Sequence, residues 1–340
     1  MKILIRGANW VGDAVMTIPA MREIRRCFPA SSITLLTRDW ARGIFQDADF
    51  VDEIITLQPD ARSFRSMSSE AKRLRNRNFD AAILFTNSFE SALLMRLAKI
   101  PRRFGYAKEF RSFLLTDPFQ IPEWKNERHE IFFHLNLVRE IDQSINKAET
   151  VFENEPQFNL TIDRERQNSA RKFLEQNGVD LNKKLVAFVA GSTNSRAKRW
   201  GAERYAMLND LIRNDLGAEV VLLGAPDEFD VSNLVFEGSV VKPVILTGKT
   251  TLSQVTAILS LCDLLISNDT GPAHIAAALG TKTLVIFGPT NPKTTKPWNA
   301  EIIREEVECS PCMLRDCPID HRCMSRISPG KVFEKAASML

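Results

Sequence analysis

The chain has 340 residues, of which 44% are apolar and 26% are charged, and its net charge at neutral pH is only +3. This length exceeds what one hydrophobic core usually supports, so we expect two domains. The small net charge argues against nucleic acid as a partner, and no uncharged run reaches the ~18 residues that span a bilayer. Charges at Arg6 and Asp13 interrupt the first apolar run, which argues against a secretory signal and predicts a cytoplasmic chain.

Strand and helix patterns alternate along the first part of the chain, and this alternation predicts a parallel sheet with helices on both faces. The stretch 101–122 is rich in Arg and Phe, and we predict it to be irregular. Short apolar runs predict strands at 2–5, 33–36, 54–57 and 81–85. Amphipathic patterns predict helices at 14–27, 66–77, 88–98 and 127–141.

We predict a linker at 143–162, which has no sustained apolar period. The alternation of strands and helices resumes after it. Strands are predicted at 185–189, 219–223, 244–246, 264–266 and 283–287, and helices at 164–177, 202–214, 252–261 and 275–279. We therefore predict an α/β chain of two Rossmann-like, doubly wound domains that face a cleft. The domains span 1–155 and 160–325, and a tail helix at 326–340 packs back on the first. Ligands of such sheets bind at the carboxyl ends of the strands.

The first strand is followed by a turn with glycines at Gly7 and Gly12, the spacing of a phosphate loop. A Walker loop continues with Lys, whereas Asp13 stands here and would repel phosphate. Asp13 opens a helix, which favours its ionised form, so it is a candidate base or acceptor for a hydroxyl. The alternative is that it only caps the helix. The pair Asp47 and Asp49 resembles a metal–diphosphate motif, but it precedes a strand, and we assign no metal to it.

The stretch 267–274 (Ser-Asn-Asp-Thr-Gly-Pro-Ala-His) follows a predicted strand and opens a helix. Pro272 suits the first helical turn, with Thr270 or Gly271 as the cap. Free N–H groups at such a helix start attract anions, phosphate above all, although the stretch also fits an ordinary strand-to-helix turn.

A second candidate is the turn Gly191-Ser192-Thr193 together with Lys198. Hydroxyls and N–H groups beside a cation suit a diphosphate, and the alternative is a solvated basic turn. Three further residues at neighbouring strand ends could contact a ribose and a base, namely Glu228, Lys249 and Thr250.

Two features leave alternatives open. Four of the six cysteines, with His321, fall within 15 residues, at Cys309, Cys312, Cys317 and Cys323. This crowding fits a zinc site, a structural thiol-rich loop or a regulatory disulfide, but the spacing matches no common zinc finger.

The stretch 62–111 holds twelve Lys/Arg and four Asp/Glu, which gives a local charge of +8. It forms either solvated helix faces or a surface for an anionic acceptor or membrane.

Taken in order, several motifs resemble the ADP-heptose:lipopolysaccharide heptosyltransferases of Gram-negative bacteria, glycosyltransferase family 9. The likeness is greatest to the branch that adds the second heptose, which shares Asn-Ser-Phe at 87–89 and the thiol-rich segment. Gly201 stands where the family usually has Pro after Lys-Arg-Trp. The motifs cover 6–19, 85–93, 101–106, 198–200, 267–280, 287–290 and 309–323.

The resemblance implies a GT-B fold and an inverting transfer of L-glycero-D-manno-heptose from ADP-heptose, without metal or cofactor. The acceptor would be the first heptose of the inner core on Kdo-lipid A. The chain would act as a monomer with a peripheral contact at the cytoplasmic face of the inner membrane. Alternatives are transfer to another core position and a non-catalytic nucleotide-sugar-binding protein. A nicotinamide oxidoreductase is disfavoured, because the glycines do not have the spacing of a dinucleotide fingerprint.

The resemblance also implies roles for single residues. Asp13 would be the general base, and Asp269 would hold the hydroxyls of the heptose. His274 belongs to the same motif without an assigned role. Lys198, Ser192, Thr193, Thr270 and Gly271 would face the diphosphate, with Glu228 and Thr250 near the adenosine. The acceptor would meet Asn87, Ser88 and the Arg-rich stretch 102–111, which includes Arg103 and Arg111.

Overall fold

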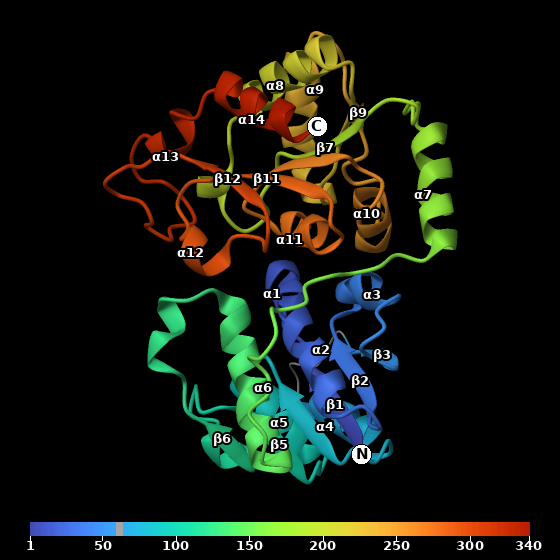
Figure 1. Cartoon of the computed structure of the whole chain (residues 1–340), viewed down its shortest axis with the longest axis vertical. Coiled ribbons are helices and arrows are strands. Elements are labelled where there is room, and N and C mark those ends of the chain that lie inside the picture. The colour runs from blue at the N-terminus through green and yellow to red at the C-terminus, as the bar shows by residue number, and fades with distance from the viewer. Residues whose placement is uncertain (59–63) are drawn as a thin grey trace. The chain divides into compact units, whose positions relative to one another are not determined.

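The computed structural model describes residues 1–58 and 64–340, which form two compact units, Met1–Phe158 and Asn159–Leu340 (Figure 1). Each unit contains one six-stranded sheet whose strand pairs are all parallel. The α/β prediction is therefore confirmed. No helix among the described residues is both long enough and apolar enough to cross a bilayer. Arg62, which opens the basic stretch, lies outside the described residues.

The sheet of the first unit has the strand order β3-β2-β1-β4-β5-β6. Every residue of β4 is buried, and β1 is buried after its first residue, as expected for strands covered on both faces. The strands are β1 (Lys2–Arg6), β2 (Ser32–Thr37), β3 (Glu53–Thr56), β4 (Ala81–Leu84), β5 (Arg102–Tyr106) and β6 (Asp117–Phe119).

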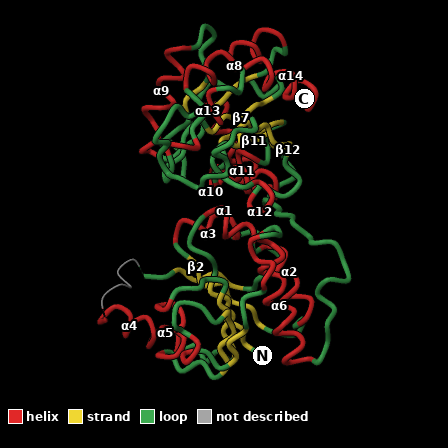
Figure 2. The backbone as a smooth tube through the Cα atoms, turned by 90° about the vertical axis from the view of Figure 1, so that its left-hand side faces the viewer, coloured by secondary structure: helices red, strands yellow, loops and turns green. Residues whose placement is uncertain are grey.

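Helices cover both faces of this sheet, with α2 packed on α6 and α4 packed on α5. Figure 2 shows these two pairs on opposite sides of the strands. The helices are α1 (Val11–Met16), α2 (Ile18–Cys27), α3 (Asp39–Phe45), α4 (Phe64–Arg75), α5 (Phe89–Leu97) and α6 (Glu130–Asn146).

Two predictions for the first unit were wrong. The single helix predicted at 14–27 is split at Thr17, whose hydroxyl donates to the carbonyl of Ala14 at 2.6 Å, and Pro19 has no N–H for the next helical bond. The stretch 101–122 is not irregular, because it contains β5 and β6. These strands lie toward the sheet edge, where Arg side chains and Pro118 are tolerated and hide the strand pattern.

The sheet of the second unit has the order β12-β11-β10-β7-β8-β9. Counted from the first strand of each unit, this order is the same as in the first unit. The short edge strand β12 was not predicted. The strands are β7 (Leu185–Val189), β8 (Glu219–Leu222), β9 (Val244–Ile245), β10 (Leu264–Asn268), β11 (Lys282–Phe287) and β12 (Glu301–Arg304).

In the second unit, α9 and α14 pack on α8, and α10 packs on α7 and α11. The apolar residues Val332 and Ala336 of α14 join the core formed by α8 and the sheet. The tail helix was expected on the first unit, but its apolar stripe completes the core of the second. The helices are α7 (Arg164–Gln176), α8 (Ala202–Asp215), α9 (Phe229–Gly238), α10 (Leu252–Leu259), α11 (Gly271–Ala278), α12 (Pro292–Thr295), α13 (Arg322–Ser325) and α14 (Pro329–Met339).

Candidate active site

The candidate residues of the second unit follow the carboxyl ends of its strands. The chain adds β8 and β9 on one side of β7, and then β10, β11 and β12 on the other. The order therefore reverses between β7 and β10, and a sheet of this kind binds its ligands at such a reversal. Lys198 follows β7 and Asp269 follows β10, so the topology places both residues at the reversal.

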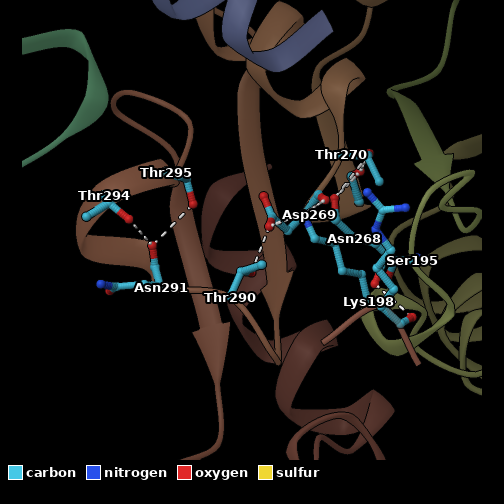
Figure 3. Close-up of polar contacts among 11 residues, drawn as sticks. Ser195, Lys198, Asn268, Asp269, Thr270, Thr290, Asn291, Thr294 and Thr295 are labelled. Atoms are coloured by element: carbon cyan, nitrogen blue, oxygen red, sulfur yellow. Dashed lines mark hydrogen bonds and ion pairs between the residues drawn. The ribbon is translucent and has the colours of Figure 1, made fainter. Parts of the chain in front are cut away.

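Lys198, Asp269 and Thr290 form the polar centre of this edge (Figure 3). The Lys198 ammonium lies 2.8 Å from Oδ2 of Asp269 and donates to the Asp269 carbonyl at 3.2 Å. The Thr290 hydroxyl donates to the same Oδ2 at 2.7 Å. The carboxylate of Asp269 is buried, whereas the Lys198 side chain is 26% exposed.

This arrangement leaves capacity for a ligand. An ammonium has three N–H donors, and Asp269 takes two of those of Lys198, so one has no partner within the described residues. Oδ1 of Asp269 accepts no hydrogen bond within the described residues, and a carboxylate oxygen is a strong acceptor for a hydroxyl. The sequence predicted both residues at one site but not that they form an ion pair. It did not single out Thr290.

Asn268, which sequence reasoning also did not select, holds the two loops together. Its Oδ1 accepts from the N–H of Trp200 at 3.1 Å and from the Tyr205 hydroxyl at 3.2 Å. Its amide donates to the carbonyls of Ala190 and Gly191 at 2.7 and 3.1 Å. All four hydrogen-bonding positions of this fully buried side chain are thus used. Asn268 therefore fixes the loop after β7 against the end of β10.

The start of α11 confirms Thr270 as the cap, with Pro272 in the first turn. The Thr270 side chain makes no capping bond to the helix and instead donates to the Asn268 carbonyl at 3.3 Å. The N–H of Ala273 donates to the Thr270 carbonyl, so fewer N–H groups are open than the sequence suggested. Gly271 begins the helix, and His274 is buried in it.

Glu228 contacts the turn that follows β7. The Thr193 hydroxyl donates to its Oε1 at 3.3 Å, and the N–H of Ala225 donates to its Oε2 at 2.9 Å. A Cβ at Gly191 would lie 2.4 Å from the Glu228 carboxyl group, so any other residue there would displace that carboxyl group. Burial raises the pKa of Glu228, and the Ala225 hydrogen bond opposes this rise. Ser192 is buried beside this contact.

Lys249 and Thr250 follow β9 through Gly248, which has a φ of +75°. Lys249 is exposed. The Thr250 hydroxyl is buried and has no hydrogen-bond partner within the described residues. An unsatisfied buried hydroxyl costs free energy, so this atom is a candidate contact for a ligand.

In the first unit, Asp13 lies half-buried in the first turn of α1. The cap position of that helix belongs to Trp10, so Asp13 is not the cap. The preceding turn is held by Arg6, which donates to the Gly7 carbonyl and to Oδ1 of Asn9. Burial, with a smaller effect from Arg38, lowers the pKa of Arg6 to about 9.

Asn87 and Ser88 form the turn after β4, next to β1 in the sheet, and Ser88 caps α5. Arg111 is wholly buried behind this turn. Its guanidinium donates to Oδ1 of Asn87 at 3.0 Å, to the Tyr106 carbonyl at 3.0 Å, and to the Thr86 carbonyl. Burial lowers the pKa of Arg111 to about 10. The sequence placed Arg111 against an acceptor, but its side chain is enclosed and shapes the turn instead.

Arg103 has a similar role on β5. Its guanidinium donates to the carbonyl of Leu114 at 2.7 Å and to those of Ile100 and Pro101. Burial, and to a lesser extent Arg96, lowers its pKa. These contacts tie Arg103 to backbone carbonyls, so the structure gives it a scaffolding role where the sequence predicted an acceptor contact.

The four clustered cysteines are free thiols, of which Cys323 is buried and Cys309 is exposed. Among the described residues, no group of three or more His, Cys, Asp or Glu side chains has an arrangement that could hold a metal ion.

The family model of glycosyltransferase family 9 (heptosyltransferase) matches residues 67–322. The chain belongs to this family. It is 31% identical over 312 residues to lipooligosaccharide heptosyltransferase 2 of Haemophilus ducreyi, with 89% of this chain and 88% of the relative covered. It is 27% identical to lipopolysaccharide heptosyltransferase 2 of Escherichia coli K12, with 100% and 99% covered.

The solved structures agree with this assignment. The structure of E. coli ADP-heptose lps heptosyltransferase II superposes with a TM-score of 0.85 at 25% identity and covers 100% of this chain and 98% of that chain. A glycosyl transferase of family 9 from Veillonella parvula gives a TM-score of 0.86 at 23% identity. The chain is therefore a glycosyltransferase, and the predicted GT-B class of fold is confirmed.

Proposed function

We propose that this glycosyltransferase transfers L-glycero-D-manno-heptose from ADP-heptose to the first heptose of the lipopolysaccharide inner core on Kdo-lipid A. The observation that carries the proposal is the Lys198–Asp269–Thr290 centre at the strand reversal of the second unit. This centre lies in a chain that matches heptosyltransferase 2 proteins along nearly its whole length. A cation and a carboxylate side by side suit a sugar joined to a diphosphate.

The second unit supplies contacts for the donor. The remaining N–H of Lys198 is directed at the diphosphate, where negative charge grows as the glycosidic bond breaks. The positive end of the α11 helix dipole, at Thr270 and Gly271, also stabilises this negative charge. Oδ1 of Asp269 accepts from a heptose hydroxyl.

The nucleoside end of the donor lies on the other side of the turn after β7. Glu228 and Thr250 there offer a buried carboxyl group and an unsatisfied hydroxyl to the ribose and the base. Thr193 and Ser192 lie between these residues and the diphosphate position.

The first unit supplies the base and the acceptor contacts. Inversion in a single displacement requires one base on the attacking hydroxyl, and Asp13 takes that role from the first turn of α1. Asn87 and Ser88 hold the acceptor, on a turn that Arg111 fixes from behind. The acceptor carries anionic groups, which the net positive charge of the surrounding stretch attracts.

The lipid part of the acceptor requires a position at a membrane surface, at the cytoplasmic face of the inner membrane. Two phenylalanines near the acceptor turn support a peripheral contact, because Phe110 is 94% exposed and Phe113 is 66% exposed. Lys108 and Arg96 are exposed beside them. Sedimentation with vesicles of anionic lipid should fall when both phenylalanines are changed to serine, and unchanged binding would remove this contact from the proposal.

The experiment that tests the reaction compares acceptors. Purified enzyme is incubated with ADP-heptose and Kdo-lipid A that either carries or lacks the first heptose, with and without EDTA, and the release of ADP is measured. We expect transfer only to the heptosylated acceptor, unaffected by EDTA. Transfer to bare Kdo-lipid A would instead place this enzyme at the first core position. Failure with both acceptors, while ADP still binds, would point to another sugar or to a binding protein.

A further inference from the structure

The thiol segment (residues 309–323) contacts the loop that carries Lys198. The Arg315 carbonyl accepts from the N–H of Ala197 at 2.9 Å and from the Ser195 hydroxyl at 3.1 Å. Nε2 of His321 lies 2.5 Å from the Ala197 carbonyl. A carbonyl oxygen can only accept, so Nε2 must carry the hydrogen of this bond. Three contacts therefore converge on the residues immediately before Lys198.

The same segment also contacts the loop that carries Thr290. The Ser310 hydroxyl donates to the Gly288 carbonyl at 2.6 Å, and the N–H of Met313 donates to the Pro289 carbonyl at 2.9 Å. A Cβ at Gly288 would lie 2.4 Å from Sδ of Met324, so the chain just beyond the segment packs directly against this loop. The thiol segment is thus bonded to the loops on both sides of Asp269.

The end of the segment is anchored in the core of the second unit. Cys323 and Met324 are buried, and the Trp200 indole donates to the Ile327 carbonyl at 3.0 Å. Burial, with smaller effects from Cys309 and the other two thiols, raises the pKa of Cys323 to about 11. The buried thiol therefore stays neutral and packs as an apolar group.

Lys198 itself is weakly supported from within its own loop. It ends a 3-10 helix of three residues (Arg196–Lys198), and such a short helix has few hydrogen bonds of its own. The ion pair between Arg196 and Asp316 is well exposed and contributes little to holding the loop. Asp269 holds the ammonium and Asn268 holds the loop at Trp200, while His321 and Arg315 hold the backbone immediately before Lys198.

We propose that the thiol segment positions Lys198 and Thr290 around Asp269, through His321 on one side and Ser310 on the other, and so sets the affinity of the enzyme for the diphosphate of its donor. This inference rests on the proposed function, because it assumes that Lys198 binds that diphosphate. His321 and Ser310 are positioning residues: each acts on a loop of the site through a backbone carbonyl.

The test measures ADP affinity by calorimetry and transfer kinetics for His321→Ala, Ser310→Ala and the double variant. Each lost hydrogen bond should weaken ADP binding by about 3- to 10-fold, with KM for the donor rising more than kcat falls. His321→Gln, which keeps an N–H donor, should recover part of the loss. Ile319→Ala is the matched control, since its side chain is exposed in the same segment. Thermal unfolding of every variant checks that it is folded.

A double-mutant cycle separates positioning from general damage. If His321 acts through Lys198, then His321→Ala should have no further effect on ADP affinity in the Lys198→Ala background. Equal effects in both backgrounds would overturn the proposal, and so would unchanged ADP affinity in folded His321→Ala and Ser310→Ala. If Lys198→Ala alone leaves ADP affinity unchanged, the donor site of the proposed function fails, and the positioning role fails with it.

Discussion

The two units have the same strand order, but the residues that follow equivalent strands carry opposite charges. In the first unit, the segment after the first strand carries the acid Asp13, and a buried cation, Arg111, supports the turn after the fourth strand. In the second unit, the segment after the first strand carries the cation Lys198, and the acid Asp269 directly follows the fourth strand. The topology therefore fixes where a site lies, while the loop residues decide what it binds.

The two cations also differ in how they are held. Arg111 is wholly enclosed and bonded to neutral oxygens, so it serves the fold of its turn. Lys198 is partly exposed and paired with Asp269, whose Oδ1 accepts no hydrogen bond within the described part of the chain, so this pair can exchange contacts with a ligand. Substitution of Lys198 should therefore affect the donor, and substitution of Arg111 should affect the acceptor.

The largest effect among binding residues is expected for Lys198→Ala. Removing a preorganised donor for the leaving group should lower kcat by about 100- to 1,000-fold and weaken ADP binding, while KM for the acceptor stays nearly constant. Lys172→Ala, on the exposed side of α7, is the control. Steady-state kinetics and ADP calorimetry check this, and a variant that lost only acceptor affinity would reverse the roles assigned to the two units.

A smaller effect, confined to the first unit, is expected for Arg111→Lys. The charge is kept, but an ammonium cannot reach all the oxygens that the guanidinium bonds, so the Asn87 turn should loosen. We expect KM for the acceptor to rise about 10-fold, with unchanged ADP affinity. Arg96→Lys, at an exposed site with one bond to a backbone carbonyl, is the matched control. An equal rise in both variants would show that Arg111 has no special role.

The smallest effect is expected for the stability of the variant Glu228→Gln, and this effect should depend on pH. Burial raises the pKa of this group, so its charged form destabilises the folded state as pH rises above the ordinary value of 4.5. Glu228→Gln cannot ionise and should unfold at higher urea than the wild type at neutral pH. The difference should vanish well below pH 4.5. The exposed Glu237→Gln is the control, and a gap that widened at low pH would contradict this sign.

Much of the fold could be predicted because buried parallel strands are continuous apolar runs, as at 185–189 and 264–266. Strands at or next to the sheet edge have no such requirement: the five residues of β5 begin with two arginines, and the edge strand β12 begins with Glu301. Their pairing is set by tertiary contacts with the neighbouring strand, which a local pattern does not contain.

The site could be predicted where the kind of side chain alone indicates the role of the residue. The pattern placed the cap of α11 at Thr270 or Gly271, and Lys198 was a cation beside a turn. The local pattern did not distinguish Arg111, one of several arginines in its stretch, as the one enclosed by oxygens. It likewise gave no sign that Asn268 would use all four of its hydrogen-bonding positions. Both facts depend on residues far away in the chain.

We propose that the base lies in the first unit and the donor site in the second. The variant Asp13→Asn separates these two roles, with ADP affinity and transfer measured on the same preparation. Asp39→Asn is the control, because Asp39 is also an acid in the first turn of a helix of that unit. We expect Asp13→Asn to bind ADP like the wild type and to lose transfer by about 100- to 10,000-fold. Retained transfer, or the loss of ADP binding, would contradict the account.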